Sequence, residues 1–248
     1  MALHFRGAAS VTTFDYLNLA LIGIALLIDH FVIWSGFVRR SEADPARARL
    51  WLWRSWMILL WTLAAAGVVL WLYTGRNWEG LKFVWPQEWR LWIAICLVLA
   101  LAITQLRTAI RIARSKRGKR IKISSPEAEM LSPRTRFEMG WFVALSLTAG
   151  FCEEFIFRGY LIWVFQPVLG LWGAAAFSVV VFAFAHAYQG AKGILSTGFI
   201  GLLFTMVVLI TGSLWPAIAL HALLDIGQGL IAWLVLRRMA DEVGMAAS

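Results

Sequence analysis

The sequence predicts an all-α membrane protein, a polytopic bundle of about seven transmembrane helices. Of its 248 residues, 60% are apolar and only 15% are charged, with 15 Trp and 16 Phe. A soluble domain is about half apolar and about a quarter charged, so this composition excludes an ordinary soluble fold and a disordered chain. The apolar residues form long runs without alternation. Because a backbone in lipid must satisfy its own hydrogen bonds, such runs predict helices and not a β-barrel.

A helix needs about 20 apolar residues to cross the hydrocarbon layer. Seven segments meet this length wholly or nearly: 14–38, 51–73, 91–107, 139–163, 171–189, 193–211 and 214–236. No cleavage site for a signal peptide follows the first of them, so we expect it to be retained as a span. Cys96 and Cys152 lie inside apolar runs, where disulfides are not expected.

The basic residues indicate the orientation. Ten of the 23 Lys and Arg lie between Arg107 and Arg136. Five more flank the first connection: Arg39, Arg40, Arg47, Arg49 and Arg54. Cytoplasmic loops carry such an excess, which predicts an outside N-terminus and an inside C-terminus. Charge at span ends also suits anionic lipids, so the partners that we expect are membrane lipids and no nucleic acid.

We divide the chain into two parts of one integral membrane domain. Residues 1–134 contain three spans and the basic cytoplasmic loop, and residues 135–240 contain the other four spans as a second helix bundle. Residues 74–90 read as an interfacial loop with an aromatic belt, and residues 108–138 form the longest polar stretch. The compact layout favours a bacterial inner membrane.

The informative residues are the ionisable ones inside the spans. A charge at the bilayer centre costs at least about 2.5 kcal/mol, so such residues are expected to face the bundle interior or a wet cavity and to have a function. They are Asp29, His30, Glu153, Glu154, Arg158, His186, His221 and Asp225. For Asp29 and His30 a polar contact between helices is favoured over a place in the cavity. Gly198 and Gly201 are read as helix-packing positions.

The fourth span contains two adjacent carboxylates, Glu153 and Glu154, with Arg158 four residues after the second. Adjacent helix positions differ by about 100°, so the carboxylates cannot both point the same way. Residues i and i+4 share a face, so Arg158 can neutralise Glu154. Glu153 is then left unpaired, as suits a general base.

Two further spans carry polar pairs one turn apart. Phe182 precedes His186, and His221 precedes Asp225, each by four residues. Either pair alone could serve only as a polar contact between neighbouring helices. Together with the two glutamates they predict a site that activates water or binds a divalent metal, with a purely structural polar cluster as the alternative.

The depths of these residues are a partial test. Glu153 lies about 21 Å from the cytoplasmic side, and His221 about 10 Å from the opposite side of a core of about 30 Å, so their levels agree. His186 lies nearer the cytoplasmic end, unless its helix is displaced or the boundary of the fifth span is wrong.

The three motifs Glu153-Glu154-x-x-x-Arg158, Phe182-x-x-x-His186 and His221-x-x-x-Asp225 resemble the signature of a known family. It is the CAAX prenyl protease type II and bacteriocin-processing (CPBP) family, also called Abi. Arg158-Gly159-Tyr160 and Thr211-Gly212-Ser213-Leu214-Trp215 support the resemblance, which covers about residues 135–236.

The resemblance implies an intramembrane endopeptidase with the catalytic residues Glu153, Glu154, Arg158, His186, His221 and Asp225. Glu153 would be the base acting on water, assisted by His186, and Glu154 with Arg158 would be the supporting pair. His221 and Asp225 would hold the oxyanion. In the family's metalloprotease description a divalent metal such as zinc would be bound, and its ligands here would be Glu153, His186, His221 and Asp225.

Asp225 departs from the family, where Asn is common. An ionised Asp cannot donate a hydrogen bond to an oxyanion, so a role in orienting His221 or binding a cation is more plausible. The expected substrate is a peptide or protein, with a prenylated C-terminus as one candidate. Two other functions stay open: a non-catalytic membrane scaffold or bacteriocin-immunity protein, and an ion-coupled or proton-coupled transporter.

Overall fold

The computed structural model describes residues 11–114 and 126–246, with the side chains of 241–246 left aside. These residues form helices and no strand, which confirms the all-α prediction. The elements in chain order are α1 (Thr13–Ile28), η1 (Asp29–Trp34), α2 (Ser35–Ala43), α3 (Pro45–Tyr73), η2 (Trp78–Leu81), α4 (Trp89–Arg114), α5 (Pro126–Leu131), α6 (Arg136–Glu153), η3 (Glu154–Leu161), α7 (Ile162–Ala185), η4 (Ala187–Gln189), α8 (Gly190–Thr211) and α9 (Trp215–Ala246).

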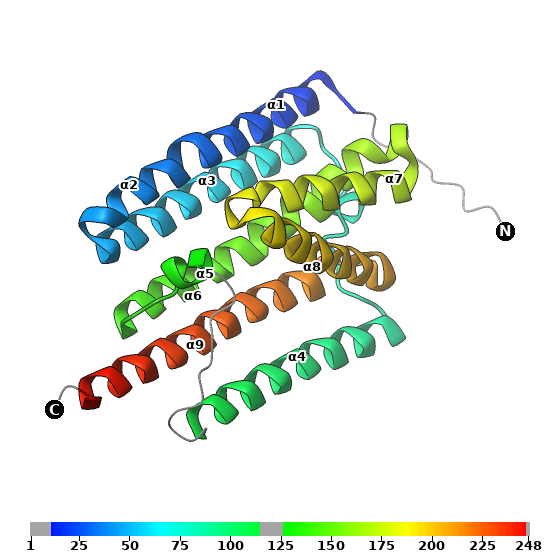
Figure 1. The fold of residues 1–248 in the computed structure, drawn as a ribbon. Coiled ribbons are helices and arrows are strands. Elements are labelled where there is room, and N and C mark those ends of the chain that lie inside the picture. The colour runs from blue at the N-terminus through cyan, green and yellow to red at the C-terminus, as the bar shows by residue number, and fades with distance from the viewer. Residues whose placement is uncertain (1–10, 115–125, 247–248) are drawn as a thin grey trace.

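Six helical stretches of the described residues are long and apolar enough to cross a membrane. One of them, Arg136–Ala185, is 50 residues long and reverses direction at Gly170, whose φ of 68° is open to glycine without strain. The arms on either side of Gly170 pack antiparallel, since Phe165 contacts Phe177 and Phe157 contacts Phe182. They correspond to the fourth and fifth predicted spans, and Figure 1 shows the hairpin at α7.

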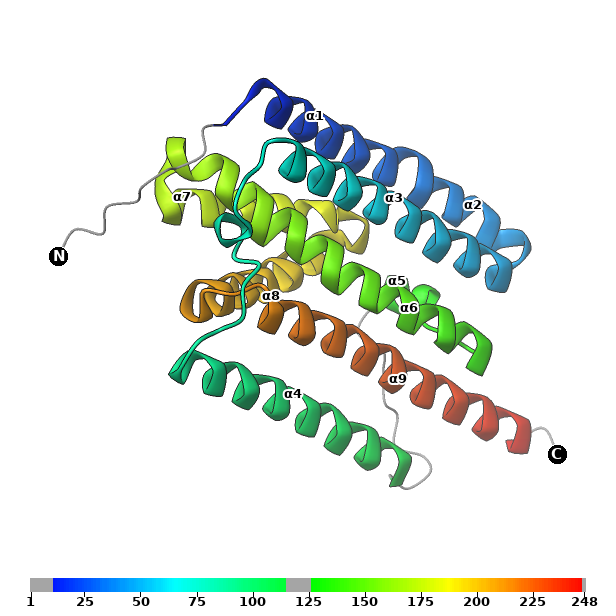
Figure 2. The ribbon, with the colours of Figure 1, turned by 180° about the vertical axis from the view of Figure 1, so that it is seen from behind.

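The basic ends of the helices gather at one end of the bundle. Figures 1 and 2 show there the α2–α3 turn, the start of α6 and the ends of α4 and α9. These ends carry the arginines used to predict the cytoplasmic side. The predicted basic run 115–122 lies outside the described residues.

The central element is the continuous helix formed by α6, η3 and the first arm of α7, which lies between α3 and α9 (Figure 2). Small residues allow α6 and α9 to approach closely. A Cβ on Gly150 would lie 2.9 Å from the Ala222 backbone nitrogen, and one on Gly229 would meet the Phe142 ring at 2.3 Å. Close backbone approach through glycine is typical of membrane helix pairs.

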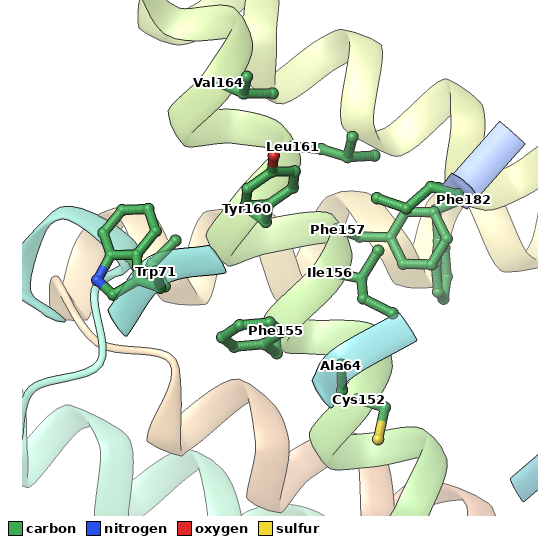
Figure 3. Packing of buried hydrophobic residues seen from close by; sticks show 12 residues of the cluster. Ala64, Trp71, Cys152, Phe155, Ile156, Phe157, Tyr160, Leu161, Val164 and Phe182 are labelled. Carbon is green, nitrogen blue, oxygen red and sulfur yellow. The ribbon is translucent and has the colours of Figure 1, made fainter. Parts of the chain in front are cut away.

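The main apolar core surrounds η3. Figure 3 shows Phe155 of η3 on the side of Trp71 from α3, and Phe157 on the other side against Phe182 from α7. The π-helical turn of η3 is wider than an α-helical turn, and such turns are common at functional sites. Every residue of η3 is buried.

The turn between α7 and α8 is half-buried and lies part-way along the bundle, which corrects the predicted fifth span of 171–189. The α-helix ends at Ala185, and η4 follows. The Tyr188 ring of η4 contacts Trp56 at 5.5 Å, and Trp56 lies 11 residues, or about 16 Å, from the start of α3. The second arm of α7 is therefore short, and His186 at its end lies deep in the bundle.

The loop 74–90, predicted to lie at the membrane interface, also packs against the helix bundle. Leu81 is fully buried, and the Leu214 backbone N–H donates to the Lys82 carbonyl at 2.8 Å. The Ser213 hydroxyl donates to the Val84 carbonyl at 2.5 Å. The turn before α9 is thus held by this loop.

One buried ion pair joins α3 to the central helix, and a second holds α1 to the loop that follows α3. Arg49 of α3 donates to Glu138 of α6 at 2.7 Å, and Arg76 pairs with Asp15 of α1 at 2.6 Å. Asp15 also accepts from the Tyr160 hydroxyl of η3 at 3.0 Å.

Candidate active site

The polar residues predicted from the sequence converge around the imidazole ring of His221. Glu153 ends α6, Glu154 begins η3, and His221 lies in α9. His221 Nδ1 lies 2.8 Å from Glu154 Oε1, and His221 Nε2 lies 3.9 Å from Glu153 Oε2. The adjacent carboxylates thus point in different directions, as their spacing predicts. Glu154 lies at Nδ1 of His221 and Glu153 lies nearer its Nε2.

Glu153 has a buried carboxylate that neither an arginine nor a hydrogen bond from His186 or His221 satisfies. Its Oε2 is buried and has no hydrogen-bond partner. The two nearest basic atoms are the Nε2 atoms of His186 at 4.0 Å and His221 at 3.9 Å, both beyond hydrogen-bond distance. A buried acceptor left without a partner costs free energy, so this oxygen is suited to receive a hydrogen bond from a water or a substrate.

Glu154 and Arg158 form a fully buried pair, with Arg158 Nη1 at 3.0 Å from Glu154 Oε1. Arg158 also donates from Nη2 to the Gly201 carbonyl at 3.1 Å and from Nε to the Thr205 hydroxyl at 3.4 Å, and its guanidinium lies 4.0 Å above the Phe182 ring. These contacts reach α7 and α8, so Arg158 holds Glu154 of η3 in place against these two helices.

The sequence did not point to Thr205 or to the Gly201 carbonyl as partners of Arg158. A Cβ at position 201 would lie 2.9 Å from Arg158 Nη2. Gly201 therefore gives the guanidinium access, beyond the helix packing expected of it. Gly198 has the packing role, with its Cβ position 3.3 Å from the Ala183 side chain.

The tautomer of His186 follows from its contacts. Its Nδ1 lies 2.9 Å from the Phe182 carbonyl, which can only accept, so Nδ1 carries the proton and donates. Nε2 faces Glu153. The Phe182 ring packs on the imidazole with centroids 4.8 Å apart, as the spacing of four predicts.

His221 is held by its neighbours on both sides. Because the Glu154 carboxylate is paired with Arg158 and can only accept, Nδ1 of His221 donates to it. The Phe204 ring of α8 covers the imidazole at 5.3 Å. Asp225 Oδ2 lies 3.6 Å from Nε2, an ion-pair distance and not a hydrogen bond, and one third of its side chain is exposed.

Side chains of η1 and α3 form an aromatic wall beside His186, made of Trp34, Trp56 and the Tyr188 ring between them. Of this wall and its partners, the sequence pointed only to Asp29. Asp29 accepts a hydrogen bond from Trp56 Nε1 at 2.6 Å. Tyr188 packs between Trp34 at 4.7 Å and Trp56 at 5.5 Å, and its ring lies 5.9 Å from that of His186. Asp29 thus makes the helix–helix contact that was favoured for it, and this contact adjoins the site.

His30 points elsewhere. It is exposed and borders an apolar groove of about 390 Å³ between η1 and α7, together with residues that include Phe31 and Phe184. It has no contact with the cluster around His221.

The distances between the carboxylate and imidazole atoms test whether the site could bind a divalent metal. Within residues 11–114 and 126–246, no group of three or more His, Cys, Asp or Glu side chains could hold a metal ion. Bonds of about 2.0 Å to a tetrahedral zinc place its ligand atoms about 3.3 Å apart. The 3.9 and 4.0 Å separations around Glu153 are wider, so the described residues do not fit a metal.

A comparison with protein families matches residues 135–227 to the type II CAAX prenyl endopeptidase family, Rce1-like. This part of the chain is similar to that family, which supports its membership. The match spans the three motifs and all six predicted site residues, and it agrees with the resemblance to the CPBP family. Neither the comparison with curated proteins nor that with solved structures gave a match.

Family and fold together identify an integral membrane protein of the CAAX-protease type. The family match begins at the N-cap residue of α6 and leaves out α1 to α5. The aromatic wall around Tyr188, which depends on Trp34 and Trp56, is therefore built partly from helices outside the match.

Proposed function

We propose that the protein is an intramembrane endopeptidase that hydrolyses a peptide bond with a water activated by Glu153. The single observation that carries the proposal is the unsatisfied, buried Oε2 of Glu153 between the Nε2 atoms of His186 and His221. A water there would be within reach of all three atoms.

In the proposed step the water donates one hydrogen to Glu153 and the other to Nε2 of His186. Nδ1 of His186 is occupied by the Phe182 carbonyl, so Nε2 has its lone pair free for this bond. Both hydrogens of the water are then directed away from the substrate, and an oxygen lone pair faces the carbonyl carbon. Glu153 takes the proton as the C–O bond forms.

His221 would stabilise the oxyanion. A proton on Nε2, with Nδ1 bound to Glu154, can be donated to the developing negative oxygen. Asp225 lies near this nitrogen and can orient the ring, but an ionised Asp cannot itself donate. The proton held by Glu153 then passes to the leaving amine as the C–N bond breaks, and the carboxylate is restored.

The substrate follows from the family and from the environment. A site within helices of this length would accept a peptide that enters from the membrane, and the matched family is described as type II CAAX prenyl endopeptidases. We propose a peptide or protein substrate, with a prenylated C-terminus as the first to test.

The test uses purified protein in nanodiscs with a farnesylated peptide ending in a CAAX sequence, and with the same peptide lacking the farnesyl group. Products are identified by mass spectrometry. Glu153→Gln should reduce cleavage by at least about 100-fold, the lower range of general-base effects. Glu79→Gln, the same change at an exposed carboxylate, is the control and should be fully active.

Retained cleavage in Glu153→Gln, with an unchanged melting temperature, would remove Glu153 from the mechanism. Loss of cleavage in chelator, restored by added zinc, would support the metalloprotease alternative. No cleavage by the wild type together with proton flux into liposomes would support a transporter, and no cleavage and no flux would support a scaffold.

A further inference from the structure

A basic pocket lies where the start of α6 meets the end of α9, away from the cluster around His221. It has a volume of about 410 Å³ and is lined by Arg134, Thr135, Arg136, Trp233 and Arg237. The antiparallel contact of α6 and α9 creates it, since Phe142 packs on Gly229 and the pairing continues toward Arg136 and Arg237.

The positive charge of this pocket is only partly compensated. Arg134 pairs with Glu129 at 3.5 Å. Glu138, the other nearby carboxylate, is occupied by Arg49 at 2.7 Å and by the backbone N–H groups at the start of α6. Within the described part of the chain, no carboxylate forms an ion pair with Arg136 or Arg237 at 4.0 Å or less.

The local geometry adds to the attraction for an anion. Thr135 is the N-cap of α6, so the positive end of an 18-residue helix faces this region. The Arg237 guanidinium lies over the Trp233 ring at 5.6 Å, which restricts its position.

The pocket also lies at the level of the membrane surface. Arg136 is the first residue of one membrane-spanning stretch, and Arg237 is near the end of another, Trp215–Ala240. Lipid phosphates are concentrated at this level, and a Trp ring is typical of it. Arginine matches the geometry of phosphate oxygens with paired N–H groups.

We propose that this pocket binds the phosphate headgroup of an anionic phospholipid, with Arg136 and Arg237 as its main ligands and Trp233 beside the start of the acyl chains. The lipid would brace the basic end of the α6–α9 pair, which carries Glu153 and His221 at its other end.

The experiment compares wild type with Arg136→Ala/Arg237→Ala. The control is Arg39→Ala/Arg47→Ala, which removes the same charge from exposed positions on α2 and α3 at the same end of the bundle. Each protein is titrated in detergent with phosphatidylglycerol or phosphatidylcholine, and bound lipid is measured by native mass spectrometry. The melting temperature is measured in nanodiscs of each lipid.

We expect phosphatidylglycerol to bind wild type and control alike and to bind Arg136→Ala/Arg237→Ala about 30-fold more weakly, the effect of two arginines near an anionic surface. Only the wild type and the control should melt higher in phosphatidylglycerol than in phosphatidylcholine.

Equal binding by the pocket variant and the control would overturn the proposal. Equal stabilisation by inorganic phosphate alone, lost in the pocket variant, would also overturn it and would assign the site to a free anion. Arg136→Gln/Arg237→Gln removes the charge but keeps the three side-chain carbons, a polar end group and a good helix propensity, and so separates loss of charge from a folding defect.

Discussion

At the scale of single residues, Arg158 organises the site without contacting the proposed water. It neutralises Glu154, and Glu154 in turn accepts from His221 Nδ1. The orientation of His221 therefore depends on an arginine that lies on another helix. Glu154 can accept from His221 as a buried carboxylate only while Arg158 neutralises it, because an unpaired buried charge is strongly destabilising.

Arg158→Ala should destabilise the protein by about 3 to 5 kcal/mol, since it leaves the Glu154 carboxylate buried and unpaired. The melting temperature and the yield of monodisperse protein measure this effect. Arg158→Ala/Glu154→Gln removes the uncompensated charge and should recover part of the loss. If the double variant is no more stable than Arg158→Ala, the ion pair is not the reason for the defect.

At the scale of helices, the distance between α6 and α9 decides whether His221 reaches Glu154. The contact is made at Gly150, where a Cβ would meet both backbone and side-chain atoms of Ala222 at 2.9 Å. His221 is adjacent to Ala222, so a shift of α9 at this point moves the imidazole.

Gly150→Ala should lower both the melting temperature and the peptidase activity, because α9 must move away from α6. Gly140→Ala, the same change on the same helix with open space around it, should be neutral or slightly stabilising, since Ala favours helix over Gly. Overpacking costs about 1 to 3 kcal/mol. Equal melting temperatures for the two variants would contradict the close approach of α6 and α9.

The contact between η1 and α3 supports His186 from the other side. Asp29→Ala removes the acceptor of Trp56 Nε1 and should lower kcat about tenfold with little change in KM, as the wall around Tyr188 loosens. Asp29→Asn keeps an acceptor oxygen and should restore most of kcat. Steady-state kinetics measures both, and equal losses in the two variants would exclude the hydrogen bond as the cause.

At the scale of the whole molecule, the part that matches the family depends on the part that does not. Residues 1–134 supply Arg49, which pairs with Glu138, and Asp15, which accepts from the Tyr160 hydroxyl. They also supply the apolar contacts of α3 with η3 and two of the aromatic rings around Tyr188. The two parts of the chain therefore share one core, as expected for a single membrane domain.

Residues 135–248 expressed alone should not yield monodisperse protein, because α6 and η3 would lose the faces of α1 and α3 that cover them. Co-expression with residues 1–134 should restore association and activity. Size-exclusion chromatography and the peptidase assay measure the outcome. A monodisperse, active fragment 135–248 would show that the N-terminal helices are dispensable.

Much of this architecture could be predicted because it depends on local sequence. The apolar runs predicted the helical stretches, including the two arms now seen on either side of Gly170, and the spacing of four predicted the contacts of Glu154 with Arg158 and of Phe182 with His186. The depth of His186 was not predicted, since hydropathy does not distinguish a short re-entrant arm from a full span. The partners of Arg158 on α8 were also missed, because a backbone carbonyl and a threonine carry no signal in a sequence.

The sequence alone determined that this is a helical membrane protein and gave six polar residues as candidates for one site, because helix length, i, i+4 spacing and motif order are properties of the chain itself. Tertiary structure alone decided that Glu153, His186 and His221 meet within about 4 Å. It also decided that Glu154 and His221, 67 residues apart, share a hydrogen bond. The physical reason is that such distances depend on how helices rotate, tilt and end against one another, and close packing of small residues between helices sets these quantities.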